Sequence, residues 1–300
     1  MTMKKLLFLM NPNAGQRKAN KHLPEIIGLF NHYGWEPTVF MTTGPGSGSA
    51  IVEERAAQYD LIVCAGGDGT LNEAISGVLR AGSSCPIGYI PCGSTNDFAA
   101  TLKLSTDVIQ AAKDIVEGGE QTYDVGLFNG RYFSYVASFG VFTRASYSTP
   151  QNLKNILGHA AYLLEGIQEL TQIRAEHVRF ELEDRVIEGD YLFGAISNST
   201  SVGGILTLDP KQVDMADGKL EILLVRAPVD ILELSECIMA VQSQKYNCAM
   251  ITFRSAEKIK VYADPFMPWT LDGERAEGAE TIHIENLHRA IRLVHRREEV

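Results

Sequence analysis

Short apolar runs alternate with helix-like patterns through the first third of the chain. The runs predict four strands, and the first and third are continuously apolar, as strands buried on both faces of a parallel sheet are. These strands cover Lys5–Met10, Pro37–Met41, Leu61–Ala65 and Ile87–Ile90. The helical patterns cover Asn20–Tyr33, Gly48–Gln58, Thr70–Leu79 and Thr106–Glu117. Strands joined by helices predict a parallel sheet, in which ligands bind at the carboxyl ends of the strands.

The pattern changes after Glu120, where strands dominate. Two predicted strands, Gln121–Leu127 and Arg131–Phe139, are joined by Phe128-Asn129-Gly130, and Asn-Gly between apolar runs is a strong hairpin signal. One amphipathic helix is expected over Leu153–Leu170. Further strands are expected at Val178–Leu182, Val186–Ile196, Lys219–Val225, Met250–Phe253, Ile259–Ala263 and Thr281–Ile284. This region therefore predicts a mainly antiparallel β structure.

The two patterns predict two domains. Residues 1–125 are expected to form an α/β domain with a parallel sheet, and residues 126–287 a β-rich domain. The last apolar run, Ala290–Val294, is expected to return to the first domain, so that residues from about 288 to 300 belong to it.

Composition places the chain among ordinary globular proteins, with 45% hydrophobic and 21% charged residues. The net charge of −10 argues against a nucleic-acid partner. The five cysteines are scattered without a C-x-x-C pair, which indicates reduced thiols rather than disulfides or zinc ligands. No apolar run is long enough to span a membrane. We therefore expect a cytoplasmic protein.

A glycine-rich loop, Gly66-Gly67-Asp68-Gly69-Thr70, connects a buried strand to a helix. Glycines let the backbone approach a ligand closely, and the amides at a helix start favour anions. An ordinary strand-to-helix turn also uses glycine and aspartate, but three glycines around one aspartate exceed what capping requires. The loop therefore predicts a phosphate site, and the absence of G-x-x-x-x-G-K-[ST] shows that it is not a Walker A loop.

Two further polar loops follow strands of the same sheet. Asn11–Gly15 follows the first strand, with Arg17, Lys18 and Lys21 soon after it, and Pro91–Asp97 follows the fourth strand. Each of these loops, taken alone, is more typical of an ordinary turn than of a ligand site. Three such loops at one edge of a parallel sheet favour a nucleotide site.

The motif order N-P-x-[AS]-G, G-G-D-G-T-L-N-E and P-x-G-[ST]-x-N-D-F-A resembles the diacylglycerol kinase catalytic-domain family, which includes bacterial soluble lipid kinases, sphingosine kinases and ceramide kinases. The resemblance covers nearly the whole chain. It continues through Tyr123–Gly126, Leu157–Leu164 and Asp217–Leu220, and it ends at Leu271–Glu274.

The resemblance implies a two-domain fold in which ATP and a lipid meet, with ATP and Mg²⁺ as cofactors. ATP contacts are expected at Asn11, Pro12, Asn13, Ala14, Gly15, Thr42, Gly66, Gly67, Asp68, Gly69, Thr70, Leu71, Asn72, Glu73, Thr95, Asn96 and Asp97. Gln16 stands where relatives often have a basic residue, so Arg17 or Lys21 is expected to contact phosphate. The chain also has Gly48-Ser49-Ala50 where relatives have Gly-Asp-Ala, and so lacks an acidic N-cap there.

The resemblance assigns further roles to acidic residues. Asp68, Asp97 and Asp124 are expected to hold the catalytic magnesium and phosphate assembly. A structural magnesium is expected at the carboxylate of Asp217, with the main-chain carbonyls of Asp214 and Lys219, and oxygen ligands suit this hard cation.

The general base is expected in Asp272-Gly273-Glu274. Asp-Gly after a strand is usually only a turn. Phosphoryl transfer to a hydroxyl, however, needs a carboxylate within reach of the attacking oxygen, and the resemblance implies Asp272 as the base with Glu274 supporting it or replacing it.

The sequence thus predicts a lipid kinase, with diacylglycerol as the expected acceptor. An isoprenoid alcohol, a sphingoid base and phosphatidylglycerol stay open. Phosphorylation of a soluble acceptor, as in NAD kinases, and nucleotide sensing without catalysis are the alternatives. The expected partner is a membrane surface that holds the lipid, contacted peripherally, and a homodimer is left open. The apolar stripe of the helix at Leu153–Ile173 is a candidate for the membrane contact, although such a stripe is more often part of a core.

Overall fold

The computed structural model of this 300-residue chain describes residues 3–15, 18–140, 175–202, 206–243, 246 and 248–296. Contacts divide the chain into unit 1, which is Met1–Val125 with His288–Val300, and unit 2, which is Gly126–Leu287. The chain passes from one unit to the other within two long strands, β5 (Gly119–Phe128) and β17 (Thr281–His295).

Unit 1 contains the predicted parallel sheet. Its strand order is β2-β1-β3-β4, and all three pairings are parallel. β17 continues this sheet by pairing parallel to β4, with Leu293 opposite Ile87. The strands are β1 (Lys4–Met10), β2 (Trp35–Met41), β3 (Leu61–Gly66) and β4 (Ile87–Pro91).

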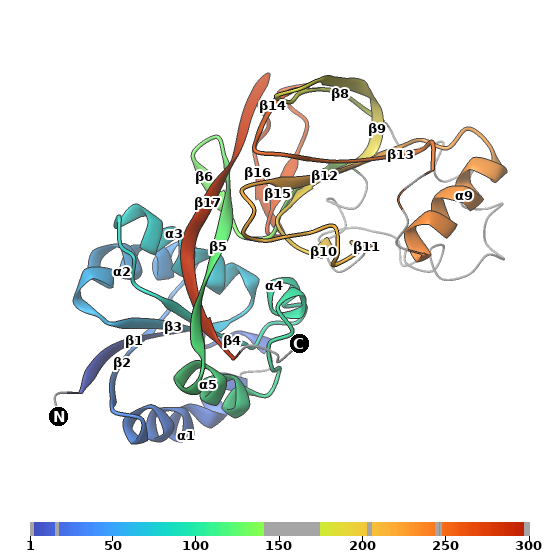
Figure 1. Ribbon diagram of the computed structural model, residues 1–300. Helices are drawn as coiled ribbons and strands as arrows, with labels where there is room; N and C mark the ends of the chain where they lie inside the picture. The colour runs from blue at the N-terminus through green and yellow to red at the C-terminus, as the bar shows by residue number, and fades with distance from the viewer. Residues whose placement is uncertain are drawn as a thin grey trace. The chain divides into compact units, whose positions relative to one another are not determined.

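Helices cover both faces of this sheet (Figure 1), with α1 and α5 on one face and α2 and α3 on the other. Phe8 and Val63 of the strands pack in one core with Phe30 of α1 and Ala112 of α5. Burial on both faces explains why β1 and β3 are continuously apolar. The helices are α1 (Lys18–His32), α2 (Ser47–Arg55) with a 3-10 turn (Ala56–Gln58), α3 (Asp68–Arg80), α4 (Asp97–Thr101) and α5 (Val108–Glu117).

Unit 2 contains the predicted antiparallel strands. The path of neighbouring strands is β16-β15-β7-β9-β8-β14-β17, and β12 joins β9 and β13. Beyond β5 and β17, the strands are β6 (Arg131–Phe133), β7 (Val136–Gly140), β8 (Glu176–Glu181), β9 (Val186–Ser197), β10 (Ser201–Val202), β11 (Leu206–Thr207), β12 (Leu220–Arg226), β13 (Ile251–Ala256), β14 (Lys258–Tyr262), β15 (Trp269–Leu271) and β16 (Glu274–Ala276). The predicted fold class, a parallel α/β part followed by an antiparallel β part, is confirmed.

Aromatic side chains form the centre of unit 2. The ring of Trp269 lies 4.9 Å from that of Phe139 and 5.1 Å from that of Phe128, between centroids. The predicted hairpin between β5 and β6 is also present, with positive φ at Asn129 (45°) and Gly130 (84°), as a type I′ turn requires.

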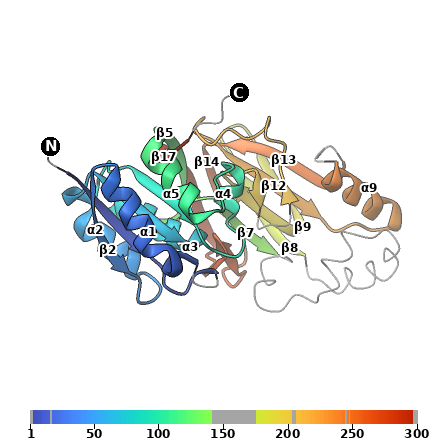
Figure 2. The same ribbon diagram turned by 90° about the horizontal axis from the view of Figure 1, so that it is seen from below.

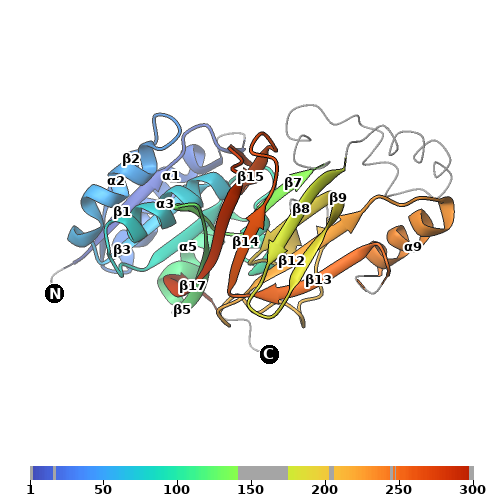
Figure 3. The same ribbon diagram turned by 90° about the horizontal axis from the view of Figure 1, so that it is seen from above.

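Several elements differ from the sequence-based expectation. A helix, α9 (Ile231–Gln242), interrupts the β-rich region, and Figures 2 and 3 show it at one end of the β12–β13 pair. The strands expected at Thr281–Ile284 and Ala290–Val294 are one continuous strand, β17. The strand expected at Arg131–Phe139 is divided into β6 and β7.

The amphipathic helix expected at Leu153–Leu170 lies outside the described residues. Within the described ranges, every helix is too short or too polar to cross a membrane.

Candidate active site

The glycine-rich loop joins β3 to α3, and α3 begins at Asp68. Its N-cap, Gly67, has extended backbone and no side-chain cap, so the helix start has the arrangement that an anion can complete. Thr70 is buried in the first turn, and its hydroxyl oxygen lies 3.5 Å from Nδ2 of Asn11 on the first loop.

Close backbone approaches pack the three predicted loops against each other. A Cβ at Gly15, whose φ is +41°, would lie 1.6 Å from the carbonyl oxygen of Cys92. A Cβ at Gly93 would lie 2.6 Å from Cα of Gly67. The prediction that the loops converge is confirmed. Their glycines permit loop-to-loop packing, and the close approach to a ligand stays a prediction.

The Asp68 carboxylate joins the second loop to the third. The backbone N–H of Asp97 donates to its Oδ2 (3.0 Å), and that of Phe98 donates to its Oδ1 (3.2 Å). These two amides open α4, whose own N-cap residue, Asn96, has φ +55° and no side-chain cap. Asp68 therefore caps α4 from another part of the chain.

Asn96 holds the third loop closed. Its Oδ1 accepts from the N–H of Gly93 (2.8 Å), and its Nδ2 donates to the carbonyl of Gly93 (2.9 Å). Thr95, between them, is exposed. In the first loop, Oδ1 of Asn11 accepts from the N–H of Asn13 (3.0 Å).

The other predicted nucleotide residues lie at varied positions. Glu73 accepts hydrogen bonds from Gly46 and Gly48 in the loop that follows Thr42. The side chain of Leu71 is fully buried in the core. Lys21 is exposed on α1, whereas Arg17 lies outside the described residues.

Asp124 is completely buried in unit 1 and is bound by β17. Its Oδ1 accepts from the backbone N–H of Arg289 (2.6 Å) and lies 3.1 Å from Nδ1 of His288. Arg289 has φ +49° in the middle of the strand, so Asp124 stabilises an irregular position of β17.

In unit 2, Asp272 and Gly273 form a two-residue turn between β15 and β16, with φ of +50° and +81°. The Asp272 side chain is turned inward, and the residue is only 7% exposed. Its Oδ2 accepts from N–H and Oγ of Ser134 (2.6 and 2.8 Å). Its Oδ1 accepts from the N–H groups of Tyr135 and Val136 (3.0 and 3.1 Å). These contacts occupy the acceptor sites of the carboxylate and divide β6 from β7.

Glu274 differs in its surroundings. Its side chain is 57% exposed, and Nη2 of Arg131 donates to its Oε2 (3.0 Å). Arg131 also binds the carbonyl of Arg275 (3.0 Å). Of the two acidic side chains in the motif, Glu274 is the one that solvent or a substrate can reach.

The predicted structural-magnesium loop consists of Asx turns. Asp214 Oδ1 accepts from Ala216 N–H (3.0 Å), and Asp217 Oδ1 accepts from Lys219 N–H (2.9 Å). The Lys219 carbonyl accepts from Nδ2 of Asn286 (2.8 Å). The available donors are all oxygens, which suits Mg²⁺. Among the residues that the structure describes, however, no three His, Cys, Asp or Glu side chains are gathered to hold a metal ion.

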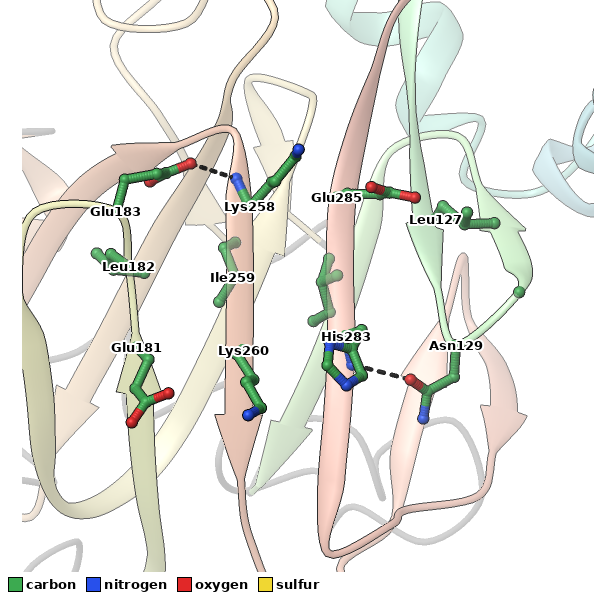
Figure 4. A pocket seen from close by; sticks show the side chains of 12 residues that line it. Leu127, Asn129, Glu181, Leu182, Glu183, Lys258, Ile259, Lys260, His283 and Glu285 are labelled. Atoms are coloured by element: carbon green, nitrogen blue, oxygen red, sulfur yellow. Dashed lines mark hydrogen bonds between the residues drawn. The ribbon is translucent and has the colours of Figure 1, made fainter.

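A hollow of about 510 Å³ lies on the strands β8, β14 and β17 of unit 2 (Figure 4). None of the predicted site residues lines it. Lys258 and Lys260 stand opposite Glu285 and Glu181 in the strand pairing, so neither sign of charge dominates. We assign no role to it.

We assign no catalytic role to Cys64, which lies near the phosphate loop. Cys64 lies on β3 just before the loop, and burial raises the pKa of its thiol well above the usual range. The thiol therefore stays neutral near pH 7.

Several residues of the site were not found from the sequence. The donors to Asp272 are largely backbone amides of Ser134 to Val136, and the partners of Glu73 are amides of Gly46 and Gly48. Almost every residue has a backbone N–H, so the sequence does not indicate which of these groups will donate to a carboxylate. The Asp272-Gly273 turn itself was the detectable feature, as were the glycines of the loops.

Comparisons with known proteins show the family to which the chain is similar. Residues 5–128 match the family model described as diacylglycerol kinase catalytic domain. Residues 135–295 match the model described as YegS C-terminal NAD kinase beta sandwich-like domain. The two matches define a two-domain kinase.

Individual relatives narrow this class. A diacylglycerol kinase of Bacillus subtilis (strain 168) is 31% identical over 97% of this chain and 96% of its own length. One from Staphylococcus saprophyticus is 31% identical over 90% of this chain and 89% of its own length. The chain belongs to the diacylglycerol kinase family and is a lipid kinase.

Solved structures support the fold. A crystal structure of a diacylglycerol kinase from Bacillus anthracis str. Sterne has a TM-score of 0.74 at 21% identity and covers 98% of both chains. A second crystal structure from that organism has a TM-score of 0.80 at 24% identity, covering 98% of this chain and 96% of the other.

Proposed function

We propose that this lipid kinase transfers the γ-phosphoryl group of ATP to the hydroxyl of diacylglycerol and produces phosphatidic acid. The observation that carries the proposal is the set of interlocked loops around the open start of α3, in a chain whose named relatives are diacylglycerol kinases. The nucleotide is assigned to unit 1 and the lipid hydroxyl to unit 2.

The phosphates of ATP are assigned to the amides from Gly67 to Gly69, since the Thr70 N–H already donates to the carbonyl of Gly67 (2.9 Å). A helix start without its own side-chain cap favours a negative charge, and the partial positive charge of the helix adds to this preference. Asn11 and Thr95, on the neighbouring loops, are further contacts in this proposal.

Bound Mg²⁺ would neutralise charge on the phosphates. Asp68, Asp97 and Asp124 are the proposed carboxylates for it. The Asp217 carboxylate and the main-chain carbonyls of Asp214 and Lys219 are proposed for a structural ion. The oxygen-only donor sets support both assignments. The two backbone bonds of Asp68 also fix the loop that carries Asp97.

We assign Glu274 as the general base and Asp272 as the residue that holds the turn. Asp272 already accepts four hydrogen bonds, whereas Glu274 is accessible and has one bond from Arg131 to Oε2. In the proposed step the lipid oxygen forms a bond to the γ-phosphorus. The bond from that phosphorus to the β,γ-bridging oxygen breaks, ADP leaves and Glu274 takes the hydroxyl proton.

The test measures phosphate transfer from γ-labelled ATP into diacylglycerol in mixed micelles. Glu274→Gln should lower turnover at least ~10²-fold while ATP still binds, because the proton acceptor is lost. The exposed Glu277→Gln, three residues along, is the matched control and should stay near wild type. Normal turnover in Glu274→Gln would remove Glu274 from the mechanism, and Asp272→Asn would then test the alternative base.

A lipid acceptor requires peripheral contact with a membrane surface, which we include in the proposal. The segment expected to provide it, Leu153–Ile173, stays a sequence-based prediction, as does a homodimer. An NAD kinase-like activity is the second candidate, because the second half of the chain matches a domain described as NAD kinase-like.

A further inference from the structure

The helix α2 begins without a cap of its own. Its N-cap residue, Gly46, is left-handed (φ +79°) and provides no side-chain acceptor. The first turn contains no acidic residue either. The amides that open a helix need acceptors, and a negative charge there stabilises the helix.

Glu73, which lies on α3, supplies both the hydrogen-bond acceptors and the negative charge. Its Oε1 accepts from the N–H of Gly46 (2.7 Å), and its Oε2 accepts from the N–H of Gly48 (2.7 Å). Hydrogen bonds to an ionised carboxylate are stronger than neutral ones. The carboxylate of Glu73 thereby supplies the negative charge that the start of α2 lacks, since Ser49 stands in its first turn where relatives are expected to have an aspartate.

The two glycines fit this contact closely. A Cβ at Gly48 would lie 2.4 Å from Oε2 of Glu73, and Gly46 has a backbone conformation that other residues rarely adopt. The helices are also joined further along, where Nη1 of Arg80 donates to Oγ of Ser49 (3.0 Å). Glu73 is thus the contact that reaches the loop itself.

We propose that Glu73 is a positioning residue, which fixes the loop Thr42–Gly46 and the start of α2 at the nucleotide edge of the sheet instead of contacting ATP. This inference rests on the proposed binding of ATP in unit 1. The loop is held at its start by the N–H of Thr42, which donates to the carbonyl of Met10 (2.9 Å), and at its end by Glu73. Both carboxylate oxygens are engaged, and their charge would repel a phosphate.

The first test measures ATP binding by calorimetry and the kinetic constants of the kinase reaction. Glu73→Ala should weaken ATP binding and raise the KM for ATP about tenfold, because a loop released at one end must be ordered again on binding. The KM for the lipid and kcat should stay within about twofold. Glu53→Ala on the exposed face of α2 is the matched control and should behave as wild type.

The second test is a double-mutant cycle with Gly48→Ala. Its methyl group would displace the Glu73 carboxylate, so Gly48→Ala alone should raise the KM for ATP by a similar factor. In the Glu73→Ala background it should add less than about twofold, because the contact is already lost. Gly48→Ala on its own still tests the contact where Glu73→Ala is poorly folded.

The outcomes are distinct. Wild-type affinity for ATP in both Glu73→Ala and Gly48→Ala would overturn the positioning role while the proposed function stands. Additive effects of the two substitutions would overturn it as well. A wild-type protein that binds no ATP would instead overturn the proposed function, and this role with it.

Discussion

Three acidic residues at motif positions bind backbone amides from distant parts of the chain. Asp68 binds the start of α4, Glu73 the start of α2, and Asp272 the bend before β7. Each carboxylate accepts hydrogen bonds from at least two backbone N–H groups. Each therefore fixes a loop that would otherwise be more flexible. At the residue scale, these acidic side chains position the backbone of neighbouring loops, in addition to any catalytic role proposed for them.

The buried thiol of Cys85 gives a prediction on pH. Burial raises the pKa of this thiol from its usual value of 9.0 to about 11, so the folded chain favours the neutral thiol. The unfolded chain releases the proton first as pH rises, and the contribution to stability present below pH 9 is lost between about 9 and about 11. At pH 8, iodoacetamide should modify Cys85 far more slowly in the native protein than in urea.

The partly exposed Cys248 serves as the internal control for that labelling. Mass spectrometry of digests should find it modified early in native protein. Equal labelling rates for Cys85 and Cys248 would contradict the assigned burial.

At the element scale, β17 combines regular pairing with one irregular position. Arg289 has φ +49° within this 15-residue strand, and Asp124 accepts its N–H. The sequence predicted two strands here, because the polar stretch around His288 interrupts the apolar pattern. The hydrogen bond from Arg289 to Asp124, a residue distant in sequence, stabilises this irregular position within the strand.

Replacing Arg289 by glycine should leave the free energy of unfolding unchanged or raise it by up to about 1 kcal/mol. A left-handed conformation costs other residues about 1–2 kcal/mol, which glycine avoids. The matched control is Arg254→Gly on β13, where φ is ordinary and glycine should cost about 0.5–1 kcal/mol. Urea denaturation measures both, and a larger loss at Arg289 than at Arg254 would contradict the strain.

Other elements differ in how well pattern predicts them. Strands β1 and β3 and the Asn129-Gly130 hairpin were found because burial on both faces and positive φ leave direct marks on composition. Helix α9 was missed because its apolar residues, such as Leu232 and Met239, are exposed, and the region around it is made of strands. The turn at Asp272 was recognised, whereas its burial by Ser134 was not, since that contact joins residues distant in sequence.

At the scale of the whole molecule, the three motifs predicted the family of the protein, which the pattern of helices and strands alone did not. The loops at Gly15, Gly67 and Gly93 pack together as expected, because parallel strands bring their carboxyl ends to one edge. The roles of Asp124 and of Asp214 with Asp217 stay predictions. Asp124 contacts the backbone N–H of Arg289 and the imidazole of His288, whereas Asp214 and Asp217 accept from backbone N–H groups.

The central claim is that the γ-phosphoryl group goes to a lipid hydroxyl. The most direct measurement incubates the protein with γ-labelled ATP and Mg²⁺, offering diacylglycerol in mixed micelles and NAD in parallel, with products identified by mass spectrometry. We expect label in phosphatidic acid and none in NADP. Label in NADP with unlabelled lipid, or no transfer to any lipid of a whole extract, would contradict it.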